Sequence, residues 1–309
     1  MKRYNDLSSH LKQQLGCKTF KVSLDIGATC PNLDGALAKK GCTFCNDAAF
    51  SPTLAQRRNK TITEQLEHGM AYVRKRHQNA QAIGYFQSFT STYGDFDLLK
   101  KKFLEAAAHP AVMGIALSTR PDCLDTRWCE FFATLAQKKY FWIELGLQSS
   151  NHESLMAMNR WHTPEQFVQA IWLLKKYGLH VCSHLLLGLP GETAQQMIQT
   201  TQFLGSLPID GIKFHNLHVV KGTQLADRWR AGQYQPLTLE TYADITVRCL
   251  ELLAPRIVVH RLNAHAPRHL TLAPDWSINK LGVLNAVEQR LLEQNTWQGK
   301  TLGFDLRIL

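Results

Sequence analysis

Three cysteines lie close together near the start of the chain, at Cys30, Cys42 and Cys45. The spacing is Cys-x11-Cys-x2-Cys. Thiolates are the usual protein ligands of iron–sulfur clusters, and a Cys-x2-Cys arm lets one turn deliver two sulfurs to neighbouring irons. Three ligands with no fourth nearby leave one iron open, and an open metal position can bind substrate. We therefore predict an iron–sulfur site. A structural zinc site, which usually brings a fourth Cys or His, and an accidental grouping stay open as alternatives.

Polar side chains occupy one face of four strand-like segments. In the segment 143–148, Glu144 and Gln148 share a face with Gly146, opposite aliphatic residues, because side chains alternate along a strand. By the same alternation, His184 and Gly188 share one face of their segment, as do Lys213 and His215 in a second and Ser118 and Arg120 in a third. Each buried polar group without a partner costs roughly 1–3 kcal/mol. This face therefore needs a polar ligand or water.

Three of these residues, Lys213, His215 and His184, are candidates for catalysis or substrate contact. Together with His218 they predict the binding of an anionic or hydrogen-bonding group. An ordinary structural role stays open for each histidine. On a strand running to residue 219, His215 and His218 would face opposite ways, which argues against a shared metal.

The elements that must position these residues alternate between strands and helices. Strands are predicted at 20–26, 82–88, 112–119, 140–148, 180–189 and 211–219, with amphipathic helices at 61–77, 97–108, 126–138, 163–177 and 193–207. Such alternation predicts an α/β fold with a parallel sheet. A doubly wound sheet would be aliphatic on both faces, and a closed eight-stranded barrel would fill its interior with branched side chains. One polar face instead predicts an incomplete barrel that holds a polar cofactor.

Helix punctuation is clear in two places. Thr163, Pro164 and Gln166 form an N-terminal signature, and Gly178 stands where that helix should end. Gly191-Glu192-Thr193 opens the next helix. After residue 220 the alternation fades into helices at 239–253 and 281–294 and a possible strand at 258–261. We therefore divide the chain into a barrel (1–220), with a cluster-binding loop at 27–50, and a C-terminal extension (221–309) packed on it.

Composition limits the class of protein. The chain has 309 residues, and 45% of them are hydrophobic, enough for one sizeable core. The N-terminus lacks a signal-peptide pattern, and no apolar run approaches the roughly 18 residues that span a bilayer, so we expect a cytoplasmic protein without a membrane partner. Thiols there stay reduced, so the five scattered cysteines should be ordinary buried or half-buried side chains. The net charge of +10 suits a polyanionic partner.

Nine short motifs extend over nearly the whole chain. They are Arg-Tyr-Asn at 3–5, Gly-Cys-Thr-Phe-Cys-Asn at 41–46, Tyr-Phe-Gln-Ser-Phe-Thr-Ser-Thr at 85–92, Thr-Arg-Pro-Asp-Cys-Leu at 119–124, Glu-Leu-Gly-Leu-Gln-Ser at 144–149, Asn-Arg-Trp-His at 159–162, Cys-Ser-His-Leu at 182–185, Gly-Leu-Pro-Gly-Glu at 188–192 and Gly-Ile-Lys-Phe-His-Asn-Leu-His at 211–218. In this order they resemble the radical S-adenosylmethionine (SAM) superfamily, in the branch of the Elongator catalytic subunit and oxygen-independent coproporphyrinogen oxidase. The resemblance is strongest to the YhcC/YtqA-type family. The long first cysteine gap departs from the common Cys-x3-Cys-x2-Cys pattern, and we expect the insertion 32–41 to form a short hairpin.

The resemblance implies a partial (βα)6 barrel of the TIM-like, radical SAM type, with a [4Fe–4S] cluster on the three cysteines at its mouth. SAM would chelate the open iron, and a reducing partner such as flavodoxin or ferredoxin would supply the electron that cleaves it to a 5′-deoxyadenosyl radical. The SAM contacts carried over by position are Ser88 or Thr90 for the amino group, Arg160 for the carboxylate, Glu144 and Gln148 for the ribose or for holding Arg160, and Gly188 and Pro190 for the adenine. Plainer interpretations stay open for Arg160, as a surface arginine, and for 188–192, as a strand-to-helix turn.

The same resemblance implies a substrate. The segment 276–280, Trp-Ser-Ile-Asn-Lys, is similar to the YtqA subgroup, some members of which are associated with tRNA. The expected reaction converts a carboxymethylaminomethyl group at C5 of the wobble uridine to aminomethyl. Two alternatives remain, namely a radical SAM enzyme acting on a small metabolite and a non-catalytic iron–sulfur or zinc-binding module.

Overall fold

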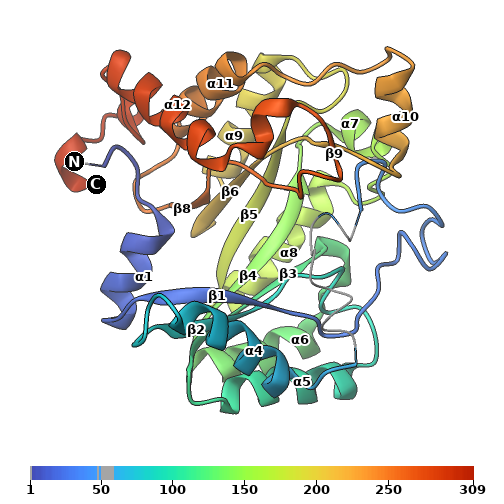
Figure 1. Ribbon diagram of the computed structural model, residues 1–309, viewed down its shortest axis with the longest axis vertical. Coiled ribbons are helices and arrows are strands. Elements are labelled where there is room, and N and C mark those ends of the chain that lie inside the picture. Colours follow the sequence, from blue (N-terminus) through green and yellow to red (C-terminus); the bar gives the residue numbers. More distant parts are fainter. Residues whose placement is uncertain (1, 47–48, 50–58) are drawn as a thin grey trace.

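Seven strands form one parallel sheet in the computed structural model, which describes residues 2–46, 49 and 59–309. In sheet order they are β1 (Thr19–Leu24), β2 (Gln81–Phe86), β3 (Val112–Thr119), β4 (Tyr140–Gln148), β5 (His180–Leu187), β6 (Gly211–Asn216) and β8 (Val258–Arg261). The sheet curls into a half-barrel (Figure 1), which confirms the predicted partial barrel. The strand predicted at 258–261 is its seventh member. β7 (Val219–Val220) and β9 (Thr271–Ala273) form a separate antiparallel pair.

Helices follow the strands in the expected alternation. They are α1 (Leu7–Leu15), α4 (Ile62–Arg74), α5 (Phe96–Ala108), α6 (Thr126–Ala136), α7 (His152–Ala157), α8 (Pro164–Lys176), α9 (Ala194–Gly205), α10 (Gln224–Arg230), α11 (Leu239–Glu251) and α12 (Lys280–Glu293). Figure 1 shows α4, α5 and α6 along the outer side of the curved sheet. Within the described ranges, every helix is too short or too polar to cross a membrane.

The core lies between the outer face of the sheet and these helices. Ile143, Leu145 and Leu147 of β4 are completely buried in it, with Phe103 of α5 and Phe132 of α6. Each such side chain contributes roughly 1.5–3 kcal/mol. The strand alternation predicted from sequence is therefore correct, and the polar members of the strands face the concave side.

Two helices begin as their sequences predict. Thr163 before α8 and Thr193 before α9 each accept a backbone hydrogen bond three residues on, and Gln166 and Gln196 complete both capping boxes. Gly178 follows α8 with φ +68°, a conformation that suits glycine. Thr193 thus begins the helix that follows β5, whereas α7, capped by Asn151, separates β4 from α8.

The part of the chain after residue 220 contributes to the sheet as well as packing on it. β8 pairs with β6, and the Val259 amide donates to the carbonyl of Asn5 over 2.7 Å. The Gln298 amide donates to the carbonyl of Arg3, so the two ends of the chain lie together (Figure 1). Residues on both sides of position 220 therefore build one sheet, and β8 carries a C-terminal side chain, Arg261, to its concave side.

Candidate functional site

The cysteine loop follows β1 and turns back on itself. The Leu33 amide donates to the carbonyl of Cys30 over 2.8 Å, and the Cys45 amide donates to the carbonyl of Cys42 over 2.9 Å. The Gly41 amide donates to the carbonyl of Asn32 and closes the insertion. Residues 32–41 contain turns and no strand, so the predicted hairpin is wrong. Residues 47, 48 and 50 of the predicted loop 27–50 lie outside the described residues.

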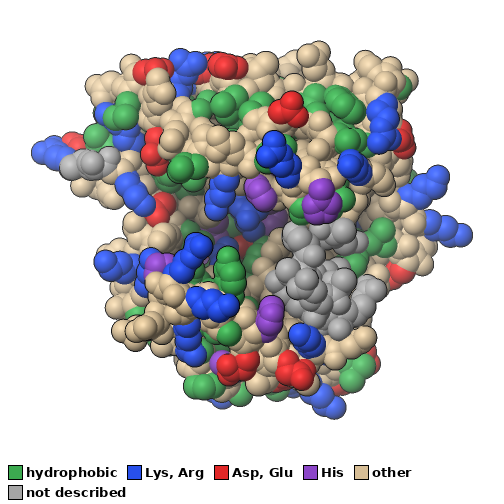
Figure 2. Space-filling view, in the orientation of Figure 1, with side chains coloured by type: hydrophobic (Ala, Val, Ile, Leu, Met, Phe, Trp, Pro, Cys, Tyr) green, Lys and Arg blue, Asp and Glu red, His purple; other side chains and the backbone are tan. Residues whose placement is uncertain are grey.

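All three cysteines line one cavity of about 460 Å³ on the concave side of the sheet. Cys42 is buried, and Cys30 and Cys45 are partly buried. Figure 2 shows a hollow on this face with Lys, Arg and His side chains around it. The other five cysteines are buried or half-buried, as predicted. The cavity thus gathers the cysteine group and the polar strand face into one place.

A turn after α7 holds the cysteine loop from outside. The side chain of Asn32 donates to the carbonyl of Asn159 over 2.7 Å, and Asn159 donates to the carbonyl of Gly41 over 2.6 Å. The Thr43 amide donates to the carbonyl of Met158. Asn159 and Trp161 have φ values of +57° and +63°, which is uncommon for a bulky residue such as tryptophan. The Asn-Arg-Trp-His motif therefore forms a turn in which two residues with positive φ flank Arg160.

Arg160 points into the cavity beside the cysteines. Its Nη1 lies 3.8 Å from the sulfur of Cys42, and its Nη2 donates to the carbonyl of Gly146 over 3.0 Å. Its Nε is buried, and no described residue forms a hydrogen bond with it. A Cβ added at Gly146 would lie 2.6 Å from Arg160 Nη2. A glycine in β4 is therefore required for this position of the guanidinium.

Arg120 is a second buried guanidinium, and it is not among the SAM contacts expected from the sequence. Its Nε and Nη2 donate to the two oxygens of Asp122 over 2.9 and 2.7 Å, while Nη1 is buried without a partner in the part of the chain that the structure describes. The side chain lines the same cavity and is 1% exposed. The sequence contained a signal for this residue, because Arg120 directly follows β3 in phase with the polar residue Ser118 and its motif supplies Asp122. A buried charge with an unpaired donor is costly, which suggests a polar ligand.

Ser88, Thr90 and Gln148 also line the cavity, as the site prediction requires. Thr90 is 1% exposed, and its amide donates to the carbonyl of Thr29, next to the first cysteine. Gln148 has φ +76° at an irregularity where β4 meets β5. These three residues come from the carboxyl ends of β2 and β4, on the side of the cysteine loop.

The structure does not bring Gly188 and Pro190 into this group. Among described residues, neither lines the cavity. Gly188 instead accepts a hydrogen bond from Tyr234, and a Cβ there would lie 3.2 Å from Leu237. Close packing against the C-terminal part explains the glycine, and the adenine contact remains a prediction without support from the cavity.

Glu144 anchors the floor of the cavity. Its carboxylate is fully buried and accepts hydrogen bonds from Lys213 (2.6 Å), Tyr85 (2.6 Å), Lys21 (3.1 Å) and Trp142 (3.2 Å). His184 Nε2 lies 2.8 Å from it. Burial alone would raise the pKa of Glu144, but Lys21, Lys213 and hydrogen bonds from histidines hold it well below its usual value. None of these hydrogen bonds joins Glu144 to Arg160, the contact that was one of its two predicted roles.

The three candidate catalytic residues differ in the contacts that their side chains form within the protein. Burial lowers the pKa of Lys213 to about 8 and that of His184 to about 4, and both side chains contact Glu144. His215 has a pKa well below its usual value, chiefly through burial, and its Nε2 has no hydrogen-bond partner within the described ranges. β6 ends at Asn216, so the expectation that His215 and His218 face opposite ways is wrong, since both line the cavity.

The donor set fits an iron–sulfur cluster better than a single metal ion. Among described residues, no three His, Cys, Asp or Glu converge closely enough for one ion. Each thiolate of a [4Fe–4S] cluster binds a different iron, so three cysteines spread over one cavity wall are suitable. The unpaired nitrogens of Arg120 and Arg160 fit a polar cofactor beside them.

Comparisons with known proteins agree on one family. The model of the Radical SAM superfamily matches residues 38–204, and that of the Radical SAM C-terminal domain matches residues 209–293. Protein YtqA of Bacillus subtilis is 37% identical over 97% of this chain and 92% of its own length. Protein YhcC of Escherichia coli K12 is 34% identical over 98% and 96%.

More distant matches extend the comparison. A tRNA uridine(34) acetyltransferase of Methanocaldococcus jannaschii is 28% identical over 54% of this chain and 31% of its own length. Among solved structures, the Elp3 protein of Methanocaldococcus infernus superposes with a TM-score of 0.69 at 16% identity. That match covers 91% of this chain and 64% of the other. It supports the fold alone.

Proposed function

Since the chain belongs to the radical SAM superfamily, we propose that it modifies tRNA at the wobble uridine, converting a carboxymethylaminomethyl group at C5 to aminomethyl. Members of the family use a [4Fe–4S] cluster and SAM. The observation that carries the proposal is one cavity lined by the three cysteines and Arg160 together with several histidines and further cations.

Cys30, Cys42 and Cys45 would hold the cluster through three irons and leave the fourth for SAM. When bound and reduced, the pair supplies a 5′-deoxyadenosyl radical that abstracts hydrogen from substrate. The protein binds and orients SAM and the substrate and excludes water, because a reactive radical must meet only its target. Phe44, Leu186 and Leu217 supply an apolar part of the cavity wall, which favours the exclusion of water. A flavodoxin or ferredoxin is the proposed source of the electron.

The proposed SAM contacts follow from the unpaired groups. Arg160 Nε and Arg120 Nη1 are buried donors without partners among residues 2–46, 49 and 59–309, and a guanidinium suits a carboxylate. We assign Thr90 and Ser88 to the amino group of SAM and Gln148 to its ribose, because these residues lie beside the cysteine loop. Of the catalytic candidates, His215 is the best placed to touch substrate, because Glu144 already engages Lys213 and His184.

Two observations support tRNA as the substrate. The net charge of +10 favours a polyanion, and the M. jannaschii relative bears a name that specifies tRNA uridine(34). The reaction would take a hydrogen atom from the carboxymethyl carbon, and loss of one further electron from that carbon would give an imine. Water would hydrolyse the imine to aminomethyluridine and glyoxylate, with SAM, which ends as methionine and 5′-deoxyadenosine, as the two-electron oxidant overall. A tRNA substrate also places the reaction in the cytoplasm.

The test uses anaerobically reconstituted protein with SAM, reductant and tRNA that carries carboxymethylaminomethyluridine. We expect 5′-deoxyadenosine and aminomethyluridine by mass spectrometry of digests, and neither product with Cys42→Ala. If 5′-deoxyadenosine forms while the modified nucleoside stays unchanged, the substrate assignment is wrong and the radical chemistry stands. A deletion strain that accumulates the carboxymethylaminomethyl nucleoside would support the assignment independently.

A further inference from the structure

The cavity contains more positive charge than its acids can balance. Glu144 is the one carboxylate among the described lining residues. The lining cations are Arg120, Arg160, Lys213, Arg261 and Lys280. Arg120 pairs with Asp122 and Lys213 with Glu144, and Arg160 donates to Gly146. The side chains of Arg261 and Lys280 form no hydrogen bond or ion pair within the described part of the chain, so their charges are available to a ligand.

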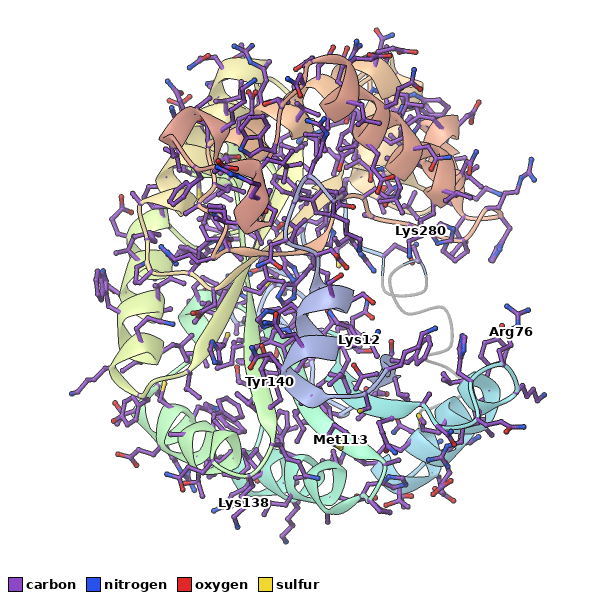
Figure 3. The ribbon with its side chains drawn as sticks, turned by 90° about the vertical axis from the view of Figure 1, so that its left-hand side faces the viewer. Lys12, Arg76, Met113, Lys138, Tyr140 and Lys280 are labelled. Atoms are coloured by element: carbon purple, nitrogen blue, oxygen red, sulfur yellow. The ribbon has the colours of Figure 1, made fainter. Side chains whose placement is uncertain are left out.

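Arg261 and Lys280 reach the cavity from the C-terminal part of the chain. Arg261 ends β8, where it pairs in register with Lys213 of β6, and Lys280 begins α12. Figure 3 places Lys280 at the edge of the C-terminal part. Burial, and then the charge of Arg261, lower the pKa of Lys280. Arg261 is half-buried, and Lys280 is exposed at the edge of the cavity that both side chains line. Two neighbouring cations repel each other, and a shared anion stabilises both.

A third polar group comes from the same region. His218 is 3% exposed, its Nδ1 lies 3.2 Å from the hydroxyl of Ser277, and its Nε2 is buried with no hydrogen-bond partner among the described residues. Ser277 lies three residues before Lys280, the first residue of α12. A buried polar atom in this position is normally satisfied, so a ligand that occupies the subsite should offer it a hydrogen bond.

We propose that Arg261 and Lys280 form an oxyanion subsite that binds the carboxylate of the substrate, with His218 as a neighbouring hydrogen-bonding group. The inference rests on the proposed function, under which the carboxylate is that of the carboxymethyl group. Binding there holds the adjacent carbon in the same cavity as the cysteines. A backbone phosphate of tRNA has the same oxyanion chemistry, and the experiment separates the two sources.

The first arm measures binding without turnover, using reconstituted protein and anticodon stem-loops. One stem-loop carries carboxymethylaminomethyluridine and the other aminomethyluridine, so that the phosphates are identical. Wild type should prefer the carboxylated stem-loop. Arg261→Ala and Lys280→Ala should weaken its binding about 10- to 100-fold, the range for hydrogen bonds to a charged group, and abolish the preference. Arg261→Lys should retain part of it.

Two exposed cations serve as matched controls. Lys12→Ala and Arg76→Ala remove the same charges outside the cavity (Figure 3) and should leave the preference unchanged. Equal weakening of both stem-loops by Arg261→Ala would assign the subsite to a phosphate and overturn the carboxylate assignment. Unchanged binding in Arg261→Ala and Lys280→Ala would overturn the subsite.

A second arm does not depend on tRNA. Sodium oxalate and inorganic phosphate should raise the melting temperature of the wild type and of both control variants, because a ligand bound to the folded state stabilises it. Arg261→Ala should lose this increase. If the increase is lost as expected but wild type does not distinguish the stem-loops, the tRNA assignment fails and the subsite stands. If oxalate and phosphate stabilise Arg261→Ala as much as wild type, the subsite fails.

Discussion

The Nζ of Lys213 lies 2.6 Å from Oε2 of Glu144, and both side chains are almost completely buried. Lys213 is on β6 and Glu144 on β4, so the contact crosses the intervening strand β5. His184 of β5 reaches the same carboxylate. Three neighbouring strands are therefore tied together on their concave side, and the ion pair closes the floor beneath the cysteines.

Loss of this carboxylate should destabilise the fold. Glu144→Ala leaves Lys213 buried without its counter-charge, and removing one partner of a buried pair costs about 3–5 kcal/mol. Urea unfolding should show a decrease of this size in the free energy of unfolding. Asp97→Ala is the control, since its pair with Arg127 is exposed on both sides and should matter little. Equal effects of the two variants would contradict the role of Glu144.

Stability should fall as the pH is lowered from about 6.5 to about 4. Burial lowers the pKa values of His184, His218 and His260 to about 4 in the folded state, from an ordinary 6.5. Between these values the unfolded chain binds more protons, so each histidine reduces stability by up to about 1.4 kcal/mol per pH unit of acidification. Urea midpoints measured from pH 7.5 to 4.5 test this, and His260→Gln should flatten the profile. A wild-type profile that is flat over that range would rule it out.

Gly146→Ala should impair SAM binding with little effect on folding. The added Cβ would meet Arg160 Nη2 and Gln148 Nε2, both at 2.6 Å. These are ends of flexible side chains, which can move away without displacing the backbone. We expect SAM affinity to fall about 10-fold, the loss of roughly one charged hydrogen bond, and the melting temperature to stay near that of the wild type. Unchanged SAM affinity would mean that the guanidinium does not contact SAM.

Each cysteine of the triad should be needed for the cluster. Cys30→Ala, Cys42→Ala and Cys45→Ala should each lower iron and sulfide content after anaerobic reconstitution and abolish formation of 5′-deoxyadenosine. Cys17→Ala is the matched control, because Cys17 does not line the cavity, and it should retain both. Zinc in place of iron and sulfide in the wild type would refute the cluster assignment.

Local patterns predicted much of this protein. The bounds of β3 and β4, the caps at Thr163 and Thr193 and the polar faces of the strands all follow from the period of two residues and from hydrogen bonds within one turn. Such features depend on neighbours in sequence, so sequence alone determines them. The cysteine spacing similarly indicated a cluster loop directly after the first strand.

The tertiary structure decided which of these residues meet. Glu144 and Lys213 are 69 residues apart, and only the order and curvature of the strands bring their side chains together. Gly188 lies on the polar face by its parity, but the C-terminal part covers it. Arg261 and Lys280 come from a region where the strand and helix alternation had faded, and β8 and α12 carry them into the cavity. Periodicity fixes the face on which a residue lies, whereas long-range packing determines what lies opposite it.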